Sequence, residues 1–329
     1  MRAAVVRALG PPESIAVEEC PIPAPGPGDI VAQVLAAGVN FADLLMVAGK
    51  YQVKPPLPFV PGLEFCGRVA SVGAGVERWR PGDRVMGAPV RGGCFAEYVT
   101  ASARHVFRAP ERLSDELAAQ FVVAYGTAAF ALQRAGLGPG ETLLVSGAGG
   151  GVGIAAVDIA ARIGARVIAA ASSPEKLRAA QAHGAHEIVD YGREELPAAI
   201  DRLTEGRGVD VTLDTVGGRF FDEALRCIAR RGRILVVGFA SGAVPRIPAE
   251  RLLLRNVSVL GIGFGGILAA EPETVEAVVE DLLALHAARP FSAEVASRYG
   301  LEGVPQALRR LADRAVVGKQ LIVPGRVEA

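Results

Sequence analysis

The feature that most constrains this chain is a glycine-rich turn, AGGGVG at residues 148–153, between an apolar run and a helix-like segment. The apolar run 143–147 predicts a buried strand, and residues 153–163 have the spacing of an amphipathic helix. Small residues at 148 and 150 allow a tight turn through which backbone N–H groups approach a pyrophosphate, and Gly153 lets the helix pack closely on the strand. The helix N-terminus favours an anion. The turn therefore predicts a dinucleotide site, and the lack of a following Lys-Ser/Thr pair excludes the phosphate loop of NTPases.

From about residue 122 the chain alternates between apolar runs and helix-like segments. Runs that are apolar throughout indicate strands covered on both faces, which is typical of a doubly wound parallel sheet in an α/β fold. Six strands are what two mononucleotide-binding halves of a Rossmann fold require. The predicted strands are 142–147, 166–171, 187–190, 209–214, 233–238 and 257–262, and the predicted helices are 153–163, 174–183, 194–204 and 220–229.

The chain before residue 122 is β-rich by pattern, with short alternating runs separated by Pro and Gly, which favours a small barrel or sandwich. The expected strands are 3–6, 30–36, 67–72, 84–86 and 95–99. After residue 266 a helix over 274–287 leads to strand-like pieces ending at 318–324, which resemble the first segment. The predicted domains are therefore 1–121, 122–266 for the nucleotide, and 267–329 as a return to the first.

Composition excludes several classes of protein. The formal net charge is zero, and we expect the basic cluster at 230–233 to cap a helix C-terminus, so nothing indicates nucleic-acid binding. No apolar run reaches the roughly 18 residues of a membrane span, and the N-terminus lacks a signal peptide, so we expect a cytoplasmic protein. The four cysteines are far apart and are expected to be reduced. His183 and His186 flank Gly184, where we expect a solvated turn and no metal site.

The end of the second strand of the nucleotide unit decides which dinucleotide binds, because an acid there would bind the ribose 2′-hydroxyl of NAD. This chain has Ala171 at that place, followed by Ser172, Ser173 and Lys176. Two hydroxyls and an ammonium suit the 2′-phosphate of NADP, and Glu175 can point into solvent as a first-turn helix acid. Alternatively, Ser173 only caps a helix and Lys176 is a solvated charge. We expect NADP(H) as the cofactor.

Several segments, taken together, resemble the medium-chain dehydrogenase/reductase superfamily. Within it the chain is similar to the zinc-independent NADPH:quinone oxidoreductases (zeta-crystallin-like), over essentially its whole length. The segments are GVNFAD (38–43), PGLEFCG (61–67), PGDRV (81–85), AYGTA (124–128), AGGGVG (148–153), DTVGG (214–218), VGFASG (237–242) and GK (318–319). The resemblance implies that the β-rich segment is a GroES-like barrel carrying the catalytic groups.

The resemblance also implies a reaction without a metal ion. Zinc-dependent relatives carry a catalytic Cys at the place of Val39 and a His at the place of Leu63, and the cysteines of their structural zinc lobe are missing. Without a Lewis acid the oxidation of alcohols is disfavoured. Quinones and related conjugated carbonyls accept hydride without a metal, because the developing charge spreads onto a carbonyl oxygen that one donor stabilises.

By resemblance, Asn40 and Tyr51 are the candidate catalytic residues, each as a hydrogen-bond donor to a substrate oxygen. Tyr51 alternatively anchors its loop, and Asp43 is expected to be structural, as a helix cap. Relatives often carry a second tyrosine at the place of Leu45. The cofactor contacts implied are Asn40, Thr127, Gly150, Gly151, Val152, Ser172, Ser173, Lys176, Tyr191, Val216, Gly238, Phe239, Ala240, Ser241, Ile262, Gly263, Phe264 and Arg314.

Two other functions remain open at this stage. One is NADPH-dependent reduction of an activated C=C bond in enones, alkenals or enoyl thioesters. The other is a non-catalytic, crystallin-like cofactor-binding protein. We also expect a homodimer, because oligomers of this superfamily extend the nucleotide sheet at its last strand, and the apolar run 256–262 is suited to such pairing.

Overall fold

A computed structural model describes residues 1–325 of the 329-residue chain. The chain forms two compact units. The central unit comprises Ala124–Phe264 and Asp281–Glu294. The N-terminal unit comprises Met1–Val123, Gly265–Glu280 and the described residues from Val295 onward.

The central unit is built on a six-stranded parallel sheet with the spatial order β10-β9-β8-β11-β12-β13. In chain order this is 3-2-1-4-5-6, so two βαβαβ halves meet between β8 and β11. The strands are β8 (Thr142–Ser146), β9 (Arg166–Ala171), β10 (Glu187–Asp190), β11 (Val209–Asp214), β12 (Ile228–Val236) and β13 (Ser258–Gly261). The predicted Rossmann fold is confirmed, and all six strands have their carboxyl ends at one edge.

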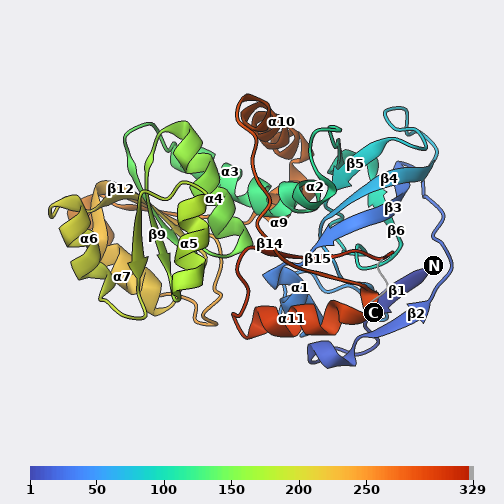
Figure 1. Ribbon diagram of the computed structural model, residues 1–329, viewed down its shortest axis with the longest axis horizontal. Coiled ribbons are helices and arrows are strands. Elements are labelled where there is room, and N and C mark those ends of the chain that lie inside the picture. The colour runs from blue at the N-terminus through green and yellow to red at the C-terminus, as the bar shows by residue number, and fades with distance from the viewer. Residues whose placement is uncertain (326–329) are drawn as a thin grey trace. The chain divides into compact units, whose positions relative to one another are not determined.

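Helices cover both faces of this sheet, with α4 and α5 on one side and α6 and α7 on the other (Figure 1). The strand residues Leu144 and Ile168 form one buried cluster with Ile200 of α6 and Phe221 of α7. Burial on both faces explains why the strands are apolar throughout. The helices are α3 (Gly126–Ala135), α4 (Gly151–Ile163), α5 (Pro174–Ala182), α6 (Leu196–Thr204), α7 (Arg219–Cys227) and α8 (Ala249–Arg255).

The basic cluster at residues 230–233 was expected to cap a helix C-terminus, and Arg233 does so, but the cluster does not follow the helix that precedes it in the chain. α7 ends at Cys227, and the cluster lies in β12. Val209 pairs with Ile228 but Val211 pairs with Arg233, so the residues between them bulge, and Arg231 has φ 64°. Such a bulge leaves no apolar alternation, so the predicted strand 233–238 missed the first part of β12. Arg233 does cap a helix, because it donates to the carbonyls of Ala135 and Gly136 at the end of α3.

The N-terminal unit is β-rich, as predicted, and its sheet is organised around the long strand β3. The order is β14-β15-β3-β4-β5-β7, and β6 also pairs with β3. β6 begins later than predicted, because Ala96 instead pairs with Ala3 through an isolated bridge. The strands are β1 (Arg2–Val5), β2 (Ala16–Glu19), β3 (Asp29–Gly38), β4 (Phe65–Val72), β5 (Arg84–Gly87), β6 (Tyr98–Ser102), β7 (Val106–Arg108), β14 (Val295–Tyr299) and β15 (Lys319–Ile322).

Helices complete the N-terminal unit. The strand β15 pairs antiparallel with β3 at Gly38, so the C-terminal part of the chain returns to the first sheet as predicted. The sequence predicted one helix over 274–287, whereas the chain forms two in this region, α9 and α10, and α10 belongs to the N-terminal unit up to Glu280 and to the central unit from Asp281. The helices are α1 (Phe41–Val47), α2 (Asp115–Gln120), α9 (Phe264–Ala270), α10 (Pro272–Ala288) and α11 (Val304–Ala312). Short 3-10 turns lie at Pro12–Ser14, Ala103–His105 and Leu301–Gly303, and a π-helix at Phe121–Tyr125 links α2 to α3.

The segment Asp281–Glu294 belongs to the central unit, although the sequence placed it with the return segment. The Phe291 ring lies 5.0 Å from the Tyr125 ring, and Arg162 donates to the carbonyl of Pro290. His183, which was wrongly expected in a solvated turn, is buried, with Asp158 3.4 Å and Glu294 3.6 Å from its ring nitrogens. The contacts made by Phe291, Pro290 and Glu294 join residues more than 100 positions apart, which sequence periodicity does not detect.

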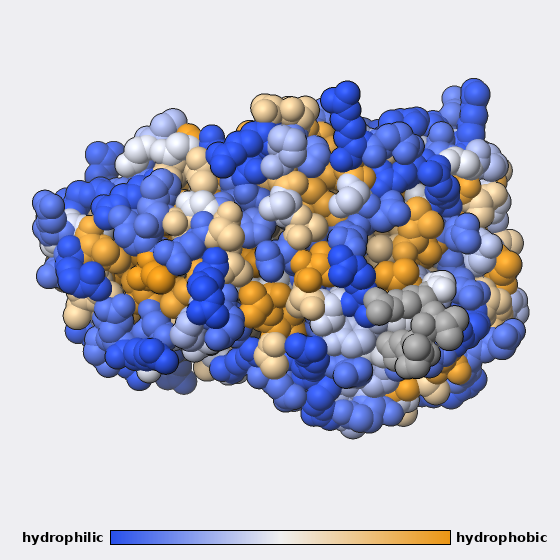
Figure 2. Space-filling view, in the orientation of Figure 1, coloured by the Kyte–Doolittle hydropathy of each residue, from blue (hydrophilic) through white to orange (hydrophobic). Residues whose placement is uncertain are grey.

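The surface of the central unit has one notable apolar stretch. On the face seen in Figure 2, apolar residues lie in patches between hydrophilic ones. Scattered apolar side chains are ordinary on a protein surface. Val244, Leu253 and Leu254, however, are each at least 70% exposed within eleven residues of chain. Among the described residues no helix is both long and apolar enough to cross a membrane. The four cysteines form no disulfide bond, as predicted.

Candidate functional site

The glycine turn connects β8 to α4 in the geometry that the sequence predicts. A Cβ at Gly153 would lie 2.3 Å from the carbonyl oxygen of Gly147, so only glycine allows α4 to start this close to the strand. A Cβ at Gly149 would lie 2.4 Å from the Cβ of Lys176 at the start of α5. The first N–H groups of α4, beginning at Gly151, have no carbonyl partner within the helix. The turn therefore offers donors and a positive helix end to an anion.

The predicted 2′-phosphate residues follow β9, which ends at Ala171. Ser172 is exposed, and Ser173 is the N-cap of α5 but makes no side-chain capping bond to its backbone. Glu175 points into solvent as expected. Its own backbone N–H and then the Ser173 hydroxyl lower the pKa of this carboxyl, and Arg178 lies 3.4 Å away. These contacts hold the Glu175 carboxylate at the N-terminus of α5.

Tyr191 lies beside these residues at the end of the neighbouring strand. Its backbone N–H donates to the carbonyl of Ala171 over 3.2 Å. Its ring is half-buried and meets Phe220 edge-on, with ring centroids 5.6 Å apart. The strand ends thus bring Tyr191 to the turn of Ser172 and Ser173, and the base of the Lys176 side chain to Gly149. The four predicted 2′-phosphate residues of the central unit gather at one corner of the sheet.

The predicted nicotinamide-side residues follow β11, β12 and β13, and they form a second group at the same edge. One carboxylate oxygen of the buried Asp214 accepts from the N–H of Val216 at 2.8 Å and of Gly217 at 3.0 Å, and from the Ser146 hydroxyl. Burial raises the pKa of Asp214. Backbone bonds then join the loops, from Ser241 N–H to the Val216 carbonyl at 2.9 Å.

The remaining nicotinamide-side residues are tied to the same loops. Gly238 donates its backbone N–H to the carbonyl of Asp214 at the end of β11, and Ala240 donates to the carbonyl of Thr215 in the loop that follows. Ile262 donates to the carbonyl of Val236 at 2.9 Å. Phe239 is 38% exposed, whereas Phe264 is buried, with its ring 5.7 Å from Phe130 of α3. The others in the central unit are Gly150 at the N-cap of α4, Val152 in its first turn, Thr127 buried in α3, and the exposed Gly263.

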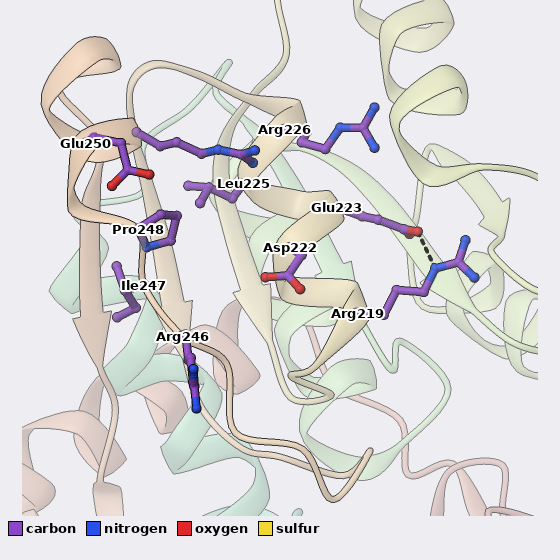
Figure 3. Close-up of a pocket in the computed structure, with 10 residues that line it drawn as sticks. Arg219, Asp222, Glu223, Leu225, Arg226, Arg246, Ile247, Pro248 and Glu250 are labelled. Atoms are coloured by element: carbon purple, nitrogen blue, oxygen red, sulfur yellow. Dashed lines mark hydrogen bonds and ion pairs between the residues drawn. The ribbon is translucent and has the colours of Figure 1, made fainter.

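A groove of about 590 Å³ lies elsewhere on the central unit, between α7 and residues 246–251 (Figure 3). Four arginines line it, and Arg219 is paired with Glu223 at 2.6 Å. None of the predicted cofactor residues lines this groove. The chemistry that suits a dinucleotide, which is the glycine turn and the loops that follow the strands, lies at the carboxyl edge of the central sheet and not in this groove.

In the N-terminal unit, Asn40 and Asp43 form a capping box at the start of α1. The backbone N–H of Asn40 donates to Asp43 Oδ2 over 2.7 Å, and the N–H of Gly62 donates to Oδ1 over 3.2 Å. Asp43 is fully buried, and burial raises its pKa to about 7. The structural role expected for Asp43 is confirmed.

The side chain of Asn40 belongs to a buried polar network that the sequence did not reveal. Its amide nitrogen donates to Glu64 Oε1 at 2.9 Å and to the Gly38 carbonyl at 3.2 Å. Its oxygen accepts from Lys319 Nζ at 2.6 Å, and Lys319 also donates to Glu64 Oε1 at 2.6 Å. Both N–H groups of the Asn40 amide are therefore engaged, so donation to a substrate oxygen requires one of these bonds to break.

Tyr51 is half-buried and packs against the core of the N-terminal unit. Burial, and then the Asp43 carboxylate, raise its pKa. A Cβ at Gly265 would lie 3.5 Å from the Tyr51 hydroxyl oxygen. Leu45, at the place of a second tyrosine, lies in α1, and Arg314 is exposed just beyond α11, in left-handed conformation with φ 56°.

The positions of the zinc ligands in zinc-dependent relatives are occupied by core residues. Val39 is 4% and Leu63 9% exposed, and both belong to the apolar core of the N-terminal unit. Over residues 1–325, no group of three or more His, Cys, Asp or Glu residues is placed to hold a metal ion. Aliphatic side chains at positions 39 and 63 supply no ligand atom.

Comparison with known proteins shows to which family the chain belongs. Residues 26–111 match the family described as "Alcohol dehydrogenase GroES-like domain", and residues 151–284 match "Zinc-binding dehydrogenase". The chain is 40% identical over 300 residues, 90% of its length and 82% of the relative's, to a quinone oxidoreductase-like protein 2 homolog of Nematostella vectensis. The chain belongs to the quinone oxidoreductase family of the medium-chain dehydrogenase/reductase superfamily.

Solved structures agree with this family membership. The Escherichia coli quinone oxidoreductase complexed with NADPH matches with a TM-score of 0.90 at 29% identity, over 98% of this chain and all of that one. The quinone oxidoreductase of Pseudomonas syringae pv. tomato DC3000 matches with a TM-score of 0.92 at 29% identity, over 98% of this chain and 99% of that one. The predicted family and fold, a Rossmann domain with a GroES-like domain, are confirmed.

The two charged partners of Asn40 that sequence reasoning missed are Glu64 and Lys319. Each lies in a segment that carried the resemblance, PGLEFCG at 61–67 and GK at 318–319, but no role followed from those segments. The 255 positions between the two residues hide their contact. For Glu64 the available signal was a charged residue between two apolar ones, Leu63 and Phe65, because such residues are seldom fully buried unless paired. Lys319, between Gly318 and Gln320, gave no such signal.

Proposed function

We propose that this protein is a metal-free, NADPH-dependent oxidoreductase that reduces quinones or related conjugated carbonyls. The observation that carries the proposal is the corner where β9 and β10 end. There Ala171 replaces the acid that would hold an NAD ribose, and Ser172, Ser173 and Lys176 follow it. Hydroxyls and an ammonium suit a 2′-phosphate. The NADPH complex of the Escherichia coli relative supports the same cofactor.

The residues of the central unit fit such a cofactor. The N-terminus of α4 at Gly151 and Val152 would hold the pyrophosphate, since its N–H groups are unpaired within the helix. The glycines that keep this turn open are required by close contacts at Gly149 and Gly153. When bound, the cofactor supplies the hydride. The loops ending at Val216, Gly238–Ser241 and Ile262–Phe264 would orient its nicotinamide half.

In this proposal Tyr51 is the hydrogen-bond donor to the oxygen of the substrate that accepts the hydride. Its hydroxyl can donate to a carbonyl oxygen that gains negative charge, whereas both N–H groups of Asn40 are engaged. Positions 39 and 63 carry no metal ligand, so no Lewis acid is proposed. A conjugated carbonyl or quinone meets this requirement, because one hydrogen bond stabilises its delocalised charge.

The test is a steady-state assay of NADPH oxidation with small quinones and with enones, with and without a chelator. We expect quinone-dependent turnover that the chelator leaves unchanged, and a KM for NADPH well below that for NADH. A saturated ketone or thioester as the main product, with quinones inert, would replace the proposal by C=C reduction. NADPH binding without turnover of any acceptor would favour a non-catalytic protein, and activity that only zinc restores would refute the metal-free reaction.

We also propose that the protein is a homodimer formed through the edge of the central sheet. β13 is the last strand of that sheet, and α8 beside it in the chain has no buried residue. Leu253 is 78% and Leu254 72% exposed. If the β13 strands of two subunits paired, the free edge of the sheet would be covered together with the exposed leucines of α8. Light scattering should give twice the chain mass, and a monomeric mass would refute the dimer. The cytoplasmic location and the lack of nucleic-acid binding stay predictions.

A further inference from the structure

Side-chain hydrogen bonds join β8 to β11 at the carboxyl edge of the central sheet, where the backbone ladder between the two strands ends. The last paired residues are Val145 and Leu213. One residue further on, the buried Ser146 hydroxyl donates to Asp214 Oδ1 over 2.9 Å. The order of the strands changes direction between β8 and β11. In sheets of this kind the ligand binds in the crevice at this switch point.

Thr215, the first residue after β11, adds two bonds to the same link. Its backbone N–H donates to the Ser146 hydroxyl oxygen at 2.8 Å, and its own hydroxyl donates to the Ser146 carbonyl at 3.1 Å. A Cβ at Gly147 would lie 2.7 Å from Thr215 Oγ1, so a glycine there leaves room for this hydroxyl. Three hydrogen bonds, from Ser146 to Asp214 and Thr215, thus form a clamp between the start of the glycine turn and the loop after β11.

Asp214 extends the clamp to the loops predicted to line the nicotinamide half. Its Oδ1 also accepts from the N–H groups of Val216 and Gly217. Its backbone carbonyl accepts from Val237 at 2.8 Å and from Gly238 at 3.3 Å, directly after β12. The position of both loops relative to the glycine turn therefore depends on one carboxyl group and on the hydroxyl that donates to it.

The bonds of the Asp214 side chain all end on one atom. Its Oδ1 accepts three donors, whereas no described residue donates to Oδ2. The clamp therefore requires an acceptor oxygen at one place. An amide oxygen can occupy that place, because a carboxylate and an amide have the same shape and the amide oxygen also has two lone pairs. A side chain without an oxygen would leave the three donors unpaired.

The clamp joins two groups of residues that are predicted to bind opposite halves of the cofactor. The glycine turn leads from β8 into α4, and the loop after β11 leads into α7, on the other face of the sheet (Figure 1). The chain therefore runs apart at this point, and bonds between side chains and loops fix the spacing. Two linked halves of a ligand bind more tightly than either half alone only when the spacing of their subsites matches the linker.

We propose that Ser146 and Asp214 are positioning residues that set the spacing between the glycine turn and the nicotinamide-side loops, so that the two halves of NADPH bind as one ligand. This inference rests on the proposed function and refines it. Both residues act through the loops that they join, so neither side chain has to touch the cofactor. The clamp should therefore contribute to the binding of the whole dinucleotide and not to that of its adenosine half.

The test compares two ligands by isothermal titration calorimetry. One is NADPH, and the other is adenosine 2′,5′-bisphosphate, which lacks the nicotinamide half. Ser146→Ala removes two of the three bonds of the clamp. We expect the Kd for NADPH to rise about tenfold, the equivalent of one lost hydrogen bond, and the Kd for the bisphosphate to change by less than about twofold. An equal loss for both ligands, or no loss for either, would overturn the inference.

Two further variants keep the inference testable. Asp214→Asn keeps an acceptor oxygen for all three donors, so its Kd for NADPH should stay within about threefold of the parent value. A tenfold loss would show that the charge and not the spacing matters, which contradicts the proposal. Thr215→Val removes only the bond to the Ser146 carbonyl. If Ser146→Ala does not fold, this variant decides, by a weaker Kd for NADPH with that for the bisphosphate unchanged.

Thr142→Val is the matched control. Thr142 is also a buried hydroxyl residue of β8, and its oxygen accepts from Arg207, just before β11, over 3.0 Å. The hydroxyl thus joins the same two strands at the opposite edge of the sheet. Its removal should lower the melting temperature and leave both Kd values unchanged. If Thr142→Val weakens NADPH binding as much as Ser146→Ala does, the effect is one of general stability and the inference fails.

The binding measurements need no acceptor, so they separate this inference from the proposed reaction. A parent protein that binds NADPH but turns over no acceptor would contradict the reaction, while the two ligands still decide the positioning role. A parent that does not bind NADPH would contradict the cofactor assignment and overturn the inference with it.

Discussion

The buried carboxyl of Asp43 should make the stability of this protein fall as the pH rises through the weakly acidic range. Asp43 is fully buried, and burial raises its pKa to about 7, against the opposing effects of the Asn40 N–H and the Lys319 ammonium. Glu64 adds to the increase. In the unfolded chain the pKa of an aspartate is about 3.9. Between these two values the folded protein binds more protons than the unfolded chain.

The sign and size of the effect follow from this difference. Where the folded state binds more protons, the free energy of unfolding decreases as the pH rises. Each pH unit inside the window corresponds to about 1.4 kcal/mol for one group. Stability from Asp43 is therefore fully present below about pH 4 and is lost as the pH approaches 7. Between about pH 5 and pH 6.5 the expected loss is about 2 kcal/mol.

The perturbation that tests this is Asp43→Asn, which removes the titrating group and nearly keeps its shape. Urea unfolding, followed by circular dichroism, should be measured for parent and variant at several pH values in this range. Titrations common to both proteins cancel in the difference between their free energies of unfolding. That difference should shift by about 2 kcal/mol in favour of the variant as the pH rises from about 5 to 6.5. Parallel pH profiles for the two proteins would refute the reasoning.

Three further substitutions test the site. Lys176→Ala should raise the KM for NADPH by about 10- to 100-fold, the value of a charge-assisted hydrogen bond, and change the KM for NADH by less than about twofold in steady-state assays. An equal effect on both cofactors would contradict the 2′-phosphate assignment. Tyr51→Phe should lower kcat/KM for the quinone about tenfold with the Kd for NADPH unchanged, and unaltered quinone kinetics would instead favour loop anchoring. Gly153→Ala places a Cβ 2.3 Å from the Gly147 carbonyl oxygen and should cost about 1–3 kcal/mol in urea unfolding, so unchanged stability would argue against the close contact.

The sequence was sufficient to predict the central unit because its signals are local. The predicted strands 166–171, 187–190 and 209–214 coincide with β9, β10 and β11. Each is a short apolar run between a turn and an amphipathic helix, and burial on both faces keeps the run uninterrupted. The glycine turn is local in the same sense, since the strand before it and the helix after it are adjacent in the chain.

Errors arose where distant residues decide the structure. The cluster at 230–233 lies in a bulged strand because Val211 pairs with Arg233, a register that no local pattern encodes. His183 is buried because Asp158 and Glu294 approach it. Similarly, Asn40 was identified as a site residue from its motif, but its hydrogen-bonding capacity depends on Lys319, 279 positions away. The motif was enough to identify Asn40, whereas its hydrogen-bond partner Lys319 became known only from the pairing of β15 with β3.

The contact between Gly149 and Lys176 limits how the cofactor preference of this protein can be changed. A Cβ at Gly149 would fall 2.4 Å from the Cβ of Lys176, so the backbone of the turn lies directly against the base of that side chain. Valine, isoleucine and threonine carry a second heavy atom on Cβ. Unbranched replacements at position 176 leave the turn in place, whereas branched ones push against it. An engineer who aims to exchange NADPH for NADH would therefore alter pyrophosphate binding together with selectivity unless the new residue is unbranched.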